Sequence, residues 1–164
     1  MATEGEDLVE GIEVRETGAG KFQVQVRTSG GAFLADEPVV VGGLGSGPTP
    51  YDLLSSALGA CTAMTVRLYA ARKGWPLTQV TVRVLHRAGG TGSRDRFARE
   101  IVLEGPLAPE QRRRLLEIAE RCSVHRTLAG GAEIVSVLAD PPLAGTLDPE
   151  PPAHAEAMVK VCED

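Results

Sequence analysis

The sequence predicts an α+β protein in which antiparallel strands wrap around one long, central, buried helix. Strand-like and helix-like segments occur in runs along the chain rather than in strict alternation, which is typical of this class. The stretch 50–72 carries no charge between Asp52 and Arg67, as expected for a helix that is buried on every face. The predicted order is three strands, the long helix, two strands, a second helix and a last strand (βββαββαβ).

Composition indicates a soluble protein with an adequate core. The chain has 164 residues, of which 43% are hydrophobic and 24% charged. Its net charge of −5 argues against a nucleic-acid-binding surface. The N-terminus is acidic, unlike a signal peptide, and the apolar stretch 53–66 is shorter than the ~18–20 residues of a membrane span. We therefore expect a cytoplasmic protein with no nucleic-acid or membrane partner.

The N-terminal part predicts an antiparallel meander. Residues 1–9 are expected to form a flexible acidic lead. Apolar and polar residues alternate over 21–28, which predicts a half-buried strand, and 11–16 is its expected partner. A third strand is predicted over 32–41, interrupted by Pro38, which favours a sheet edge or a bulge.

Both ends of the long helix carry recognisable signals. Thr49 is suited to the N-cap, Pro50 to the first helical position, and Asp52 completes a capping box with Thr49. Gly74 is a natural C-terminal cap. The helix would span ~23 residues, or ~35 Å, with Cys61 near its middle.

The second half of the chain predicts two strands, a helix and a strand. Alternating valines over 80–84 indicate one strand, and a second is expected around 100–104. A helix is predicted over 109–122, with Cys122 on its apolar face because the apolar positions recur at helical spacing. Residues 132–139 are expected to form the last strand.

Domain organisation follows from these elements. Residues 10–139 form the expected main domain, and 140–164 an appended acidic, proline-rich tail with a short helix at 153–161. We expect Cys162 to be incidental, in a flexible part of this tail.

The chain has three cysteines, an odd number, and no secretory signal, so a disulfide scaffold is not expected. On composition alone, Cys61 and Cys122 are two core thiols, since free cysteine is among the most buried residue types. The competing interpretation is nucleophilic chemistry. If the helix continues past Cys122, His125 and Arg126 share its face and would lower its pKa. Charge alone therefore favours Cys122 as the nucleophile.

The sequence favours neither nucleotide binding nor metal binding. The glycine-rich loop 42–50 precedes a helix and could hold an anion, but it lacks the Lys-Ser/Thr ending of a P-loop, and Pro48 breaks the dinucleotide-binding spacing. Cys122 and His125 have the C-x-x-H spacing of zinc ligands, but a structural zinc needs four ligands and no second pair exists. We expect no cofactor and no metal.

The stretch GGLGSGPTPYDLLSSALGACTAMTVRLYA, followed some sixty residues later by RCSVHRTL, resembles the OsmC/Ohr family of thiol-dependent hydroperoxide reductases. The similarity covers roughly 12–139 and is greatest to the OsmC-like branch. It implies a swapped homodimer with the active site at the subunit interface. It also implies that Cys61 attacks an organic hydroperoxide and becomes a sulfenic acid, that Cys122 resolves it as a disulfide, and that an external dithiol, such as a lipoylated protein, reduces the disulfide.

The sequence departs from the family at the residues that assist the thiolate. Tyr51 stands where the peroxidases have a glutamate, with Asp52 one position later, and Ala19 occupies the usual region of an arginine. Three basic residues are candidates to replace that arginine: Arg15, Lys21 and Arg27.

The resemblance implies a mostly apolar substrate cleft, for which Leu54, Leu58 and Met64 are candidate lining residues. The resulting hypothesis is a peroxidase for organic hydroperoxides in oxidative-stress defence. The alternative, motivated by the altered helper residues, is a binding protein or thiol redox sensor on the same fold, with little peroxidase activity.

Overall fold

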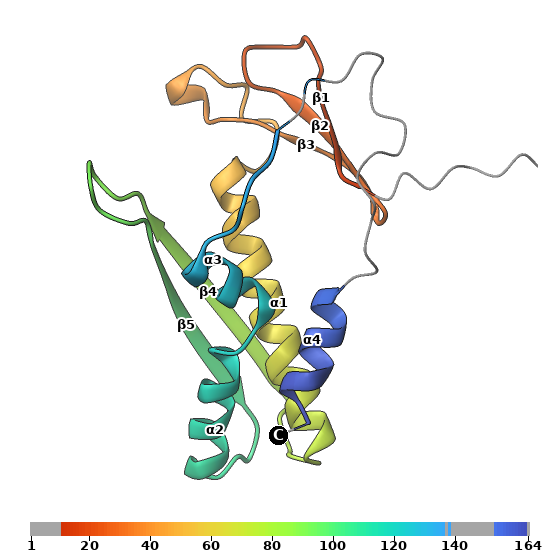
Figure 1. Cartoon of the computed structure of the whole chain (residues 1–164), viewed down its shortest axis with the longest axis vertical. Helices are drawn as coiled ribbons and strands as arrows, with labels where there is room; N and C mark the ends of the chain where they lie inside the picture. The colour runs from red at the N-terminus through yellow and green to blue at the C-terminus, as the bar shows by residue number, and fades with distance from the viewer. Residues whose placement is uncertain (1–10, 137, 139–152, 164) are drawn as a thin grey trace, which may run out of the picture. The chain divides into compact units, whose positions relative to one another are not determined.

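The computed structural model describes residues 11–136, 138 and 153–163 (Figure 1). The chain divides into two compact units, one built on residues up to 52 and the other on 53–135 together with the C-terminal helix. The predicted class is confirmed: the described residues form an α+β fold with antiparallel strands and one long helix.

The first unit contains the predicted meander. Strands β1 (Glu13–Glu16), β2 (Val24–Thr28) and β3 (Gly31–Ala35) form an antiparallel sheet in that order. The third strand is shorter than predicted, because the chain leaves the sheet after Ala35 and forms a 3₁₀ turn, η1 (Val39–Val41).

Asp36 organises the glycine-rich loop that follows. Its carboxylate accepts the main-chain N–H groups of Glu37 (2.8 Å), Leu44 (3.0 Å) and Ser46 (3.2 Å), and the Ser46 hydroxyl (2.8 Å). Burial alone would raise the pKa of this carboxyl, but these hydrogen bonds together hold the pKa below its ordinary value. A Cβ at Gly43 would lie 1.9 Å from the Glu37 carbonyl oxygen, so the close approach requires glycine. The loop is therefore built around its own carboxylate.

The long helix α1 (Pro50–Arg72) has the predicted bounds. Its capping box is formed: the Asp52 carboxylate accepts the Thr49 N–H (2.9 Å), and the Thr49 hydroxyl accepts the Asp52 N–H (3.1 Å). By length and composition α1 could cross a membrane, with mean hydropathy 1.2. Its buried side chains, among them Val66 and Tyr69, instead pack in a core with Leu115 and Ile118.

The second unit places a long hairpin against α1. Strands β4 (Gln79–Arg87) and β5 (Arg96–Glu104) pair antiparallel over their full length and are longer than predicted. Burial alternates strictly along both strands, so one face packs inward and the other is exposed. A Cβ at Gly59 would lie 3.4 Å from a Val84 methyl group, which shows how closely α1 approaches this sheet.

The predicted helix ending at Cys122 is wrong in its C-terminal part. Helix α2 (Pro109–Ala119) ends before this residue, and a new helix, α3 (Ser123–Gly130), begins after it. Cys122 has the extended backbone of an N-cap (φ −63°, ψ 145°), so the chain turns at this position although the apolar spacing continues.

The predicted last strand is also wrong where it can be observed. Residues 132–136 form no strand, and the side chains of Ile134 and Val135 are 87% and 77% exposed. Their alternating pattern finds no strand to pair with among the described residues. Residues 137 and 139 of this segment lie outside them.

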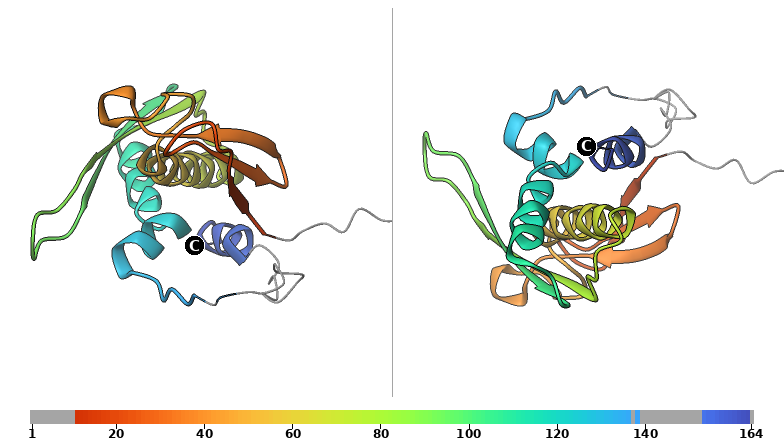
Figure 2. Two further views of the ribbon diagram at one scale, coloured as in Figure 1. Left: turned by 90° about the horizontal axis from the view of Figure 1, so that it is seen from above. Right: turned by 90° about the horizontal axis from the view of Figure 1, so that it is seen from below.

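Helix α4 (Ala153–Val161) confirms the predicted short C-terminal helix. The expected flexible position of Cys162 is wrong, because this residue is 4% exposed and packs in the core with Val66 and Ala70 of α1. The Arg72 guanidinium donates to the Val159 carbonyl oxygen (3.1 Å) and so satisfies a C-terminal carbonyl of α4. Viewed roughly along α1, the β4–β5 hairpin, α2, α3 and α4 surround the helix (Figure 2).

Candidate active site

The two predicted reactive thiols meet in one small apolar cluster of the second unit. Its buried members are Leu58, Cys61 and Cys122, and the surrounding half-buried side chains are Val84, Phe97, Val124, Leu128 and Met158. Sequence spacing could not show this contact. Cys61 is 6% exposed and Cys122 is fully buried, and both are free thiols.

The two thiols are held by different local structures. Cys61 lies in the middle of α1, where its carbonyl oxygen accepts the Thr65 hydroxyl at 2.8 Å. Cys122 is the N-cap of α3, and its Sγ accepts the main-chain N–H of His125 at 3.4 Å. A thiol at an N-cap faces the positive end of its helix, which favours a negative charge on sulfur.

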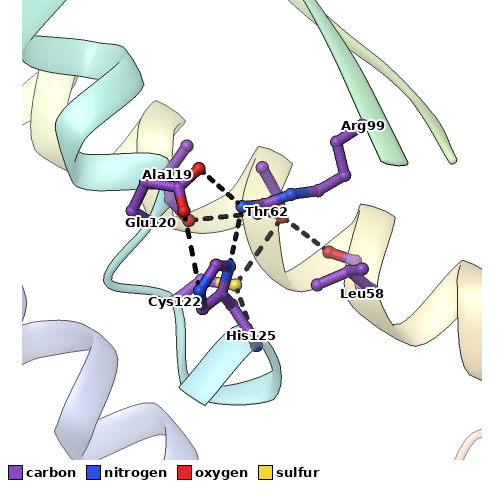
Figure 3. A network of polar contacts seen from close by, with 7 residues as sticks. All are labelled: Leu58, Thr62, Arg99, Ala119, Glu120, Cys122 and His125. Atoms are coloured by element: carbon purple, nitrogen blue, oxygen red, sulfur yellow. Dashed lines mark hydrogen bonds and ion pairs between the residues drawn. The ribbon is translucent and has the colours of Figure 1, made fainter. Parts of the chain in front are cut away.

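Thr62 connects α1 to Cys122 (Figure 3). Its buried hydroxyl donates to the Leu58 carbonyl oxygen at 2.7 Å and lies 3.6 Å from Cys122 Sγ. Burial raises the pKa of the Cys122 thiol above its ordinary value, and the neighbouring Cys61 thiol adds to the rise. The contacts with Thr62 and the His125 N–H lower the pKa in opposition.

Arg99 is the site residue that the sequence analysis missed. It lies on the inner face of β5 with a side chain only 8% exposed. Nη1 donates to the Thr62 hydroxyl (2.7 Å) and to the Ala119 carbonyl oxygen (3.1 Å), and Nη2 donates to Glu120 (2.9 Å). The available signal was its register: Arg99 lies on the same inward face of the strand as Phe97 and Ile101, where an unpaired charge would be costly.

His125 completes the polar network (Figure 3). Its Nδ1 lies 2.8 Å from Nη2 of Arg99, and its Nε2 lies 3.5 Å from Glu120 Oε2. Because a guanidinium only donates hydrogen bonds, Nδ1 must be the acceptor. The neutral ring therefore carries its proton on Nε2, toward the Glu120 carboxylate.

This geometry corrects the charge-based argument for Cys122. The helix does not continue through Cys122, so the predicted shared face does not exist. The His125 ring is directed to Arg99 and Glu120 instead of to the thiol, and Arg126 is exposed. Only the main-chain N–H of His125 reaches the sulfur.

A cleft of about 310 Å³ borders the thiol cluster and combines apolar and charged walls. It is lined by Leu58, Asp95, Phe97, Arg99, Ile101, Leu116, Glu120, His125, Leu128 and Ala129. Of the three predicted lining residues only Leu58 is among them. Leu54 is half-buried elsewhere on α1, and Met64 is 59% exposed.

The other predicted supporting residues belong to the first unit. Tyr51 and Asp52 are exposed, and hydrogen bonds from Thr49 lower the pKa of Asp52, whose carboxylate caps α1. Lys21 is exposed, and Arg27 pairs with Glu13 at 3.8 Å. Within the described residues, no group of three or more His, Cys, Asp or Glu side chains is placed to hold a metal ion.

Fold and site define the class: an α+β protein with two buried thiols beside a partly apolar cleft. A family model described as OsmC-like protein matches residues 43–136, which is more than half of the chain. The protein therefore belongs to the OsmC family.

Solved structures support the fold. An OsmC-like protein from Mycoplasma pneumoniae is 19% identical, with a TM-score of 0.63, covering 73% of this chain and 86% of that one. An organic hydroperoxide resistance protein OsmC from Legionella pneumophila is 21% identical (TM-score 0.55; 73% and 90% covered). The organic hydroperoxide resistance protein OhrB of Bacillus subtilis is 16% identical (TM-score 0.53; 73% and 90% covered). No curated protein sequence matches the chain.

Proposed function

We propose that this protein is a thiol-dependent peroxidase that reduces organic hydroperoxides, with Cys61 as the attacking thiol and Cys122 as the resolving one. The observation that carries the proposal is the packing of both thiols in one buried cluster beside a partly apolar cleft. The OsmC family includes organic hydroperoxide resistance proteins, which supports a general role in peroxide stress.

These two sulfurs are sufficient for a complete catalytic cycle. The Cys61 thiolate attacks the distal peroxide oxygen and the O–O bond breaks, which gives a sulfenic acid on Cys61. The alkoxide that leaves takes up the proton that the Cys61 thiol released and becomes the alcohol. The Cys122 sulfur then attacks Cys61 Sγ, the S–O bond breaks, and hydroxide leaves with the Cys122 proton as water. A dithiol reductant supplies two electrons and two protons, restores both thiols and becomes a disulfide.

The surroundings of the two sulfurs support this division of roles. Cys61 retains some exposure, whereas Cys122 is fully buried, so an incoming peroxide reaches Cys61 more readily. Leu58, Phe97 and Leu128 line the cleft and contact the thiol cluster. Apolar walls favour an alkyl hydroperoxide over hydrogen peroxide because the alkyl group gains from burial.

The same proposal includes a homodimer, a dithiol reductant such as a lipoylated protein, and a cytoplasmic location, with no metal or cofactor. Exposed apolar side chains support a second copy as a partner: Val39, Val40 and Val41 in η1, and Ile134 and Val135 in the segment expected to be a strand. Light scattering coupled to size-exclusion chromatography tests this, and a monomer at micromolar concentration would contradict it.

The direct test is to mix reduced protein with one equivalent of cumene hydroperoxide. Thiol loss is followed by stopped flow, and the products are mapped by peptide mass spectrometry. We expect rapid loss of two thiols and a Cys61–Cys122 linkage. Slow loss spread over all three cysteines would exclude an activated peroxidatic thiol.

The alternative is a binding protein or thiol sensor on the same fold. It is favoured by Tyr51 at the position of the family's glutamate and by the engagement of Asp52 in capping α1. In that case a ligand would raise the melting temperature, and peroxide would be consumed no faster than by a free thiol.

A further inference from the structure

We propose that the Thr62 hydroxyl, held by Arg99, is the donor that stabilises Cys122 as a thiolate when it attacks the sulfenic acid. Arg99 acts through Thr62 and is a positioning residue. The role of both residues rests on the proposed peroxidase function, in which Cys122 must ionise to resolve the sulfenic acid.

The Thr62 hydroxyl has one proton and two lone pairs with which to form hydrogen bonds. The proton is donated to the Leu58 carbonyl oxygen at 2.7 Å. One lone pair accepts Nη1 of Arg99 at 2.7 Å. The second lone pair is then the partner for Cys122, whose Sγ lies at 3.6 Å. In the thiol state every bonding position of this buried oxygen is therefore occupied.

Ionisation of Cys122 changes this arrangement in one way only. A thiolate cannot donate, so the Cys122–Thr62 contact survives only if Thr62 becomes the donor. Rotation about the Thr62 C–O bond turns the O–H away from the Leu58 carbonyl and toward Cys122 Sγ, so the hydroxyl keeps its proton and changes its acceptor. The Leu58 carbonyl can give up this bond because it also lies within the main-chain ladder of α1. The hydroxyl thus follows the charge state of the sulfur.

Arg99 makes this exchange possible without moving the oxygen. A guanidinium stays protonated and donates in both states, so Nη1 holds Thr62 Oγ1 whichever way the hydroxyl points. Its other bonds, to Ala119 and Glu120 at the end of α2 and to His125 on α3, fix its own position. A donor to the hydroxyl oxygen also makes the O–H a stronger donor to the thiolate.

The groups around Cys122 come from every element that packs on it. α1 contributes Cys61 and Thr62, and β5 contributes Arg99. Glu120, which follows α2, and the ring of His125 bond to Arg99 rather than to the sulfur. β4 and α4 contribute the uncharged Val84 and Met158. Among these described residues Arg99 is the permanent cation, and it reaches the sulfur through the Thr62 hydroxyl.

The consequence for the reaction concerns the resolving step. The Cys122 thiolate attacks Cys61 Sγ of the sulfenic acid, the S–O bond breaks, and the hydroxide that leaves takes up a proton as water. The Thr62 hydroxyl and the His125 N–H are the donors that support the charge on Cys122 before this attack. They offset part of the cost that burial imposes on this charge.

Thr65 provides a matched control for Thr62. Both are fully buried threonines on α1, and both hydroxyls donate to the carbonyl oxygen four residues earlier. In the part of the chain that the structure describes, the Thr65 hydroxyl bonds to the Cys61 carbonyl oxygen and to no thiol or guanidinium. Thr62→Val and Thr65→Val therefore remove equivalent hydroxyls, and only the first removes a donor to Cys122.

The test measures ionisation of Cys122 directly, in full-length protein with Cys61→Ala and Cys162→Ala. The ¹³Cβ shift of the remaining cysteine is recorded against pH, which requires no access of a reagent to the buried sulfur. We expect Thr62→Val to raise the midpoint by about one pH unit, a tenfold change. Thr62→Ser should restore it, and Thr65→Val should leave it unchanged. Equal midpoints for the two valine variants would overturn the proposal.

A second measurement, on chains with all three cysteines, separates this proposal from the proposed function. After one equivalent of cumene hydroperoxide, dimedone traps the sulfenic acid, and the rate of disulfide formation is followed separately. We expect Thr62→Val to form sulfenic acid at the wild-type rate and disulfide about tenfold more slowly. If wild type itself forms no sulfenic acid, the peroxidase function fails, whereas the titration still decides the role of Thr62.

Discussion

Cys61 and Cys122 share one cluster but lie in two different environments. Cys61 is in the middle of a long helix, with its carbonyl oxygen already bonded to Thr65 and its thiol slightly exposed. Cys122 is at the junction between two helices, fully buried, and its sulfur contacts a hydroxyl and a main-chain N–H. Cys61 thus keeps a small exposure, whereas Cys122 has none and has hydrogen-bond partners at its sulfur instead.

Under the proposed function, these environments correspond to two tasks. Attack on a peroxide requires a sulfur that the substrate can reach, while resolution requires a sulfur that can carry negative charge away from water. Burial opposes that charge, and the donors around Cys122 offset part of the cost. Substitutions at the cysteines and at Arg99 test how far the two environments determine the two roles.

The largest effect is expected from removing either thiol. Cys61→Ser should abolish peroxide turnover, because no attacking sulfur remains. Cys122→Ser should still lose one thiol per peroxide but stall as a sulfenic acid, which dimedone and mass spectrometry detect. Cys162→Ser is the matched control. Turnover by Cys61→Ser at the wild-type rate would exchange the proposed roles or exclude both.

The next largest effect concerns the stability contributed by Arg99. Arg99→Met leaves the buried Thr62 hydroxyl and the Ala119 carbonyl with fewer partners, so we expect the free energy of unfolding to fall by about 3 kcal/mol. Arg83 is the matched control on the same hairpin, since its side chain is 74% exposed and pairs with Glu100 at 3.7 Å. Urea unfolding of Arg83→Met should give nearly wild-type stability. Equal losses would show that Arg99 has no special structural role.

The raised pKa of Cys122 makes stability depend on pH in a defined direction. Because burial raises this pKa in the folded state, the unfolded chain releases the thiol proton first as pH rises through the ordinary thiol range near ~8.5. Stability is therefore fully present below that range and is lost as pH approaches the folded pKa, by at most about 1.4 kcal/mol per pH unit. Urea unfolding from pH 7 to 9.5 under reducing conditions should show a shallower decline for Cys122→Ala. Identical slopes would contradict the assigned direction.

Local sequence signals predicted the elements that local interactions determine. The capping box at Thr49 and Asp52 fixes the start of α1, and both hydrogen bonds are formed. The end of α2 could not be predicted, because the apolar spacing continues to Cys122 while the backbone turns there. Arg99 could be recognised only by its inward register on β5, since its partners come from three separate segments.

The strand predicted over 132–136 is wrong for another reason. Alternating apolar residues indicate that a segment can pair, but they do not specify a partner. The exposure of Ile134 and Val135 shows that this partner is not provided within the described residues. Long-range pairing and thiol contacts both depend on tertiary structure, which a single sequence does not encode as a local signal.

The smallest effect is expected at the third thiol, which tests whether burial beside α1 is enough to activate a cysteine. Cys162 packs near Thr65, with its Sγ 4.0 Å from the Thr65 carbonyl oxygen, and burial raises its pKa while Arg72 acts in the opposite direction. Its sulfur bonds to an acceptor, and among the described residues no hydrogen-bond donor supports a negative charge on it. We expect Cys162→Ser to change peroxide turnover by less than about twofold. A change of that size corresponds to less free energy than one ordinary hydrogen bond contributes. A tenfold loss, measured with cumene hydroperoxide, would mean that a buried position alone suffices, and the contrast between Cys61 and Cys122 would lose its basis.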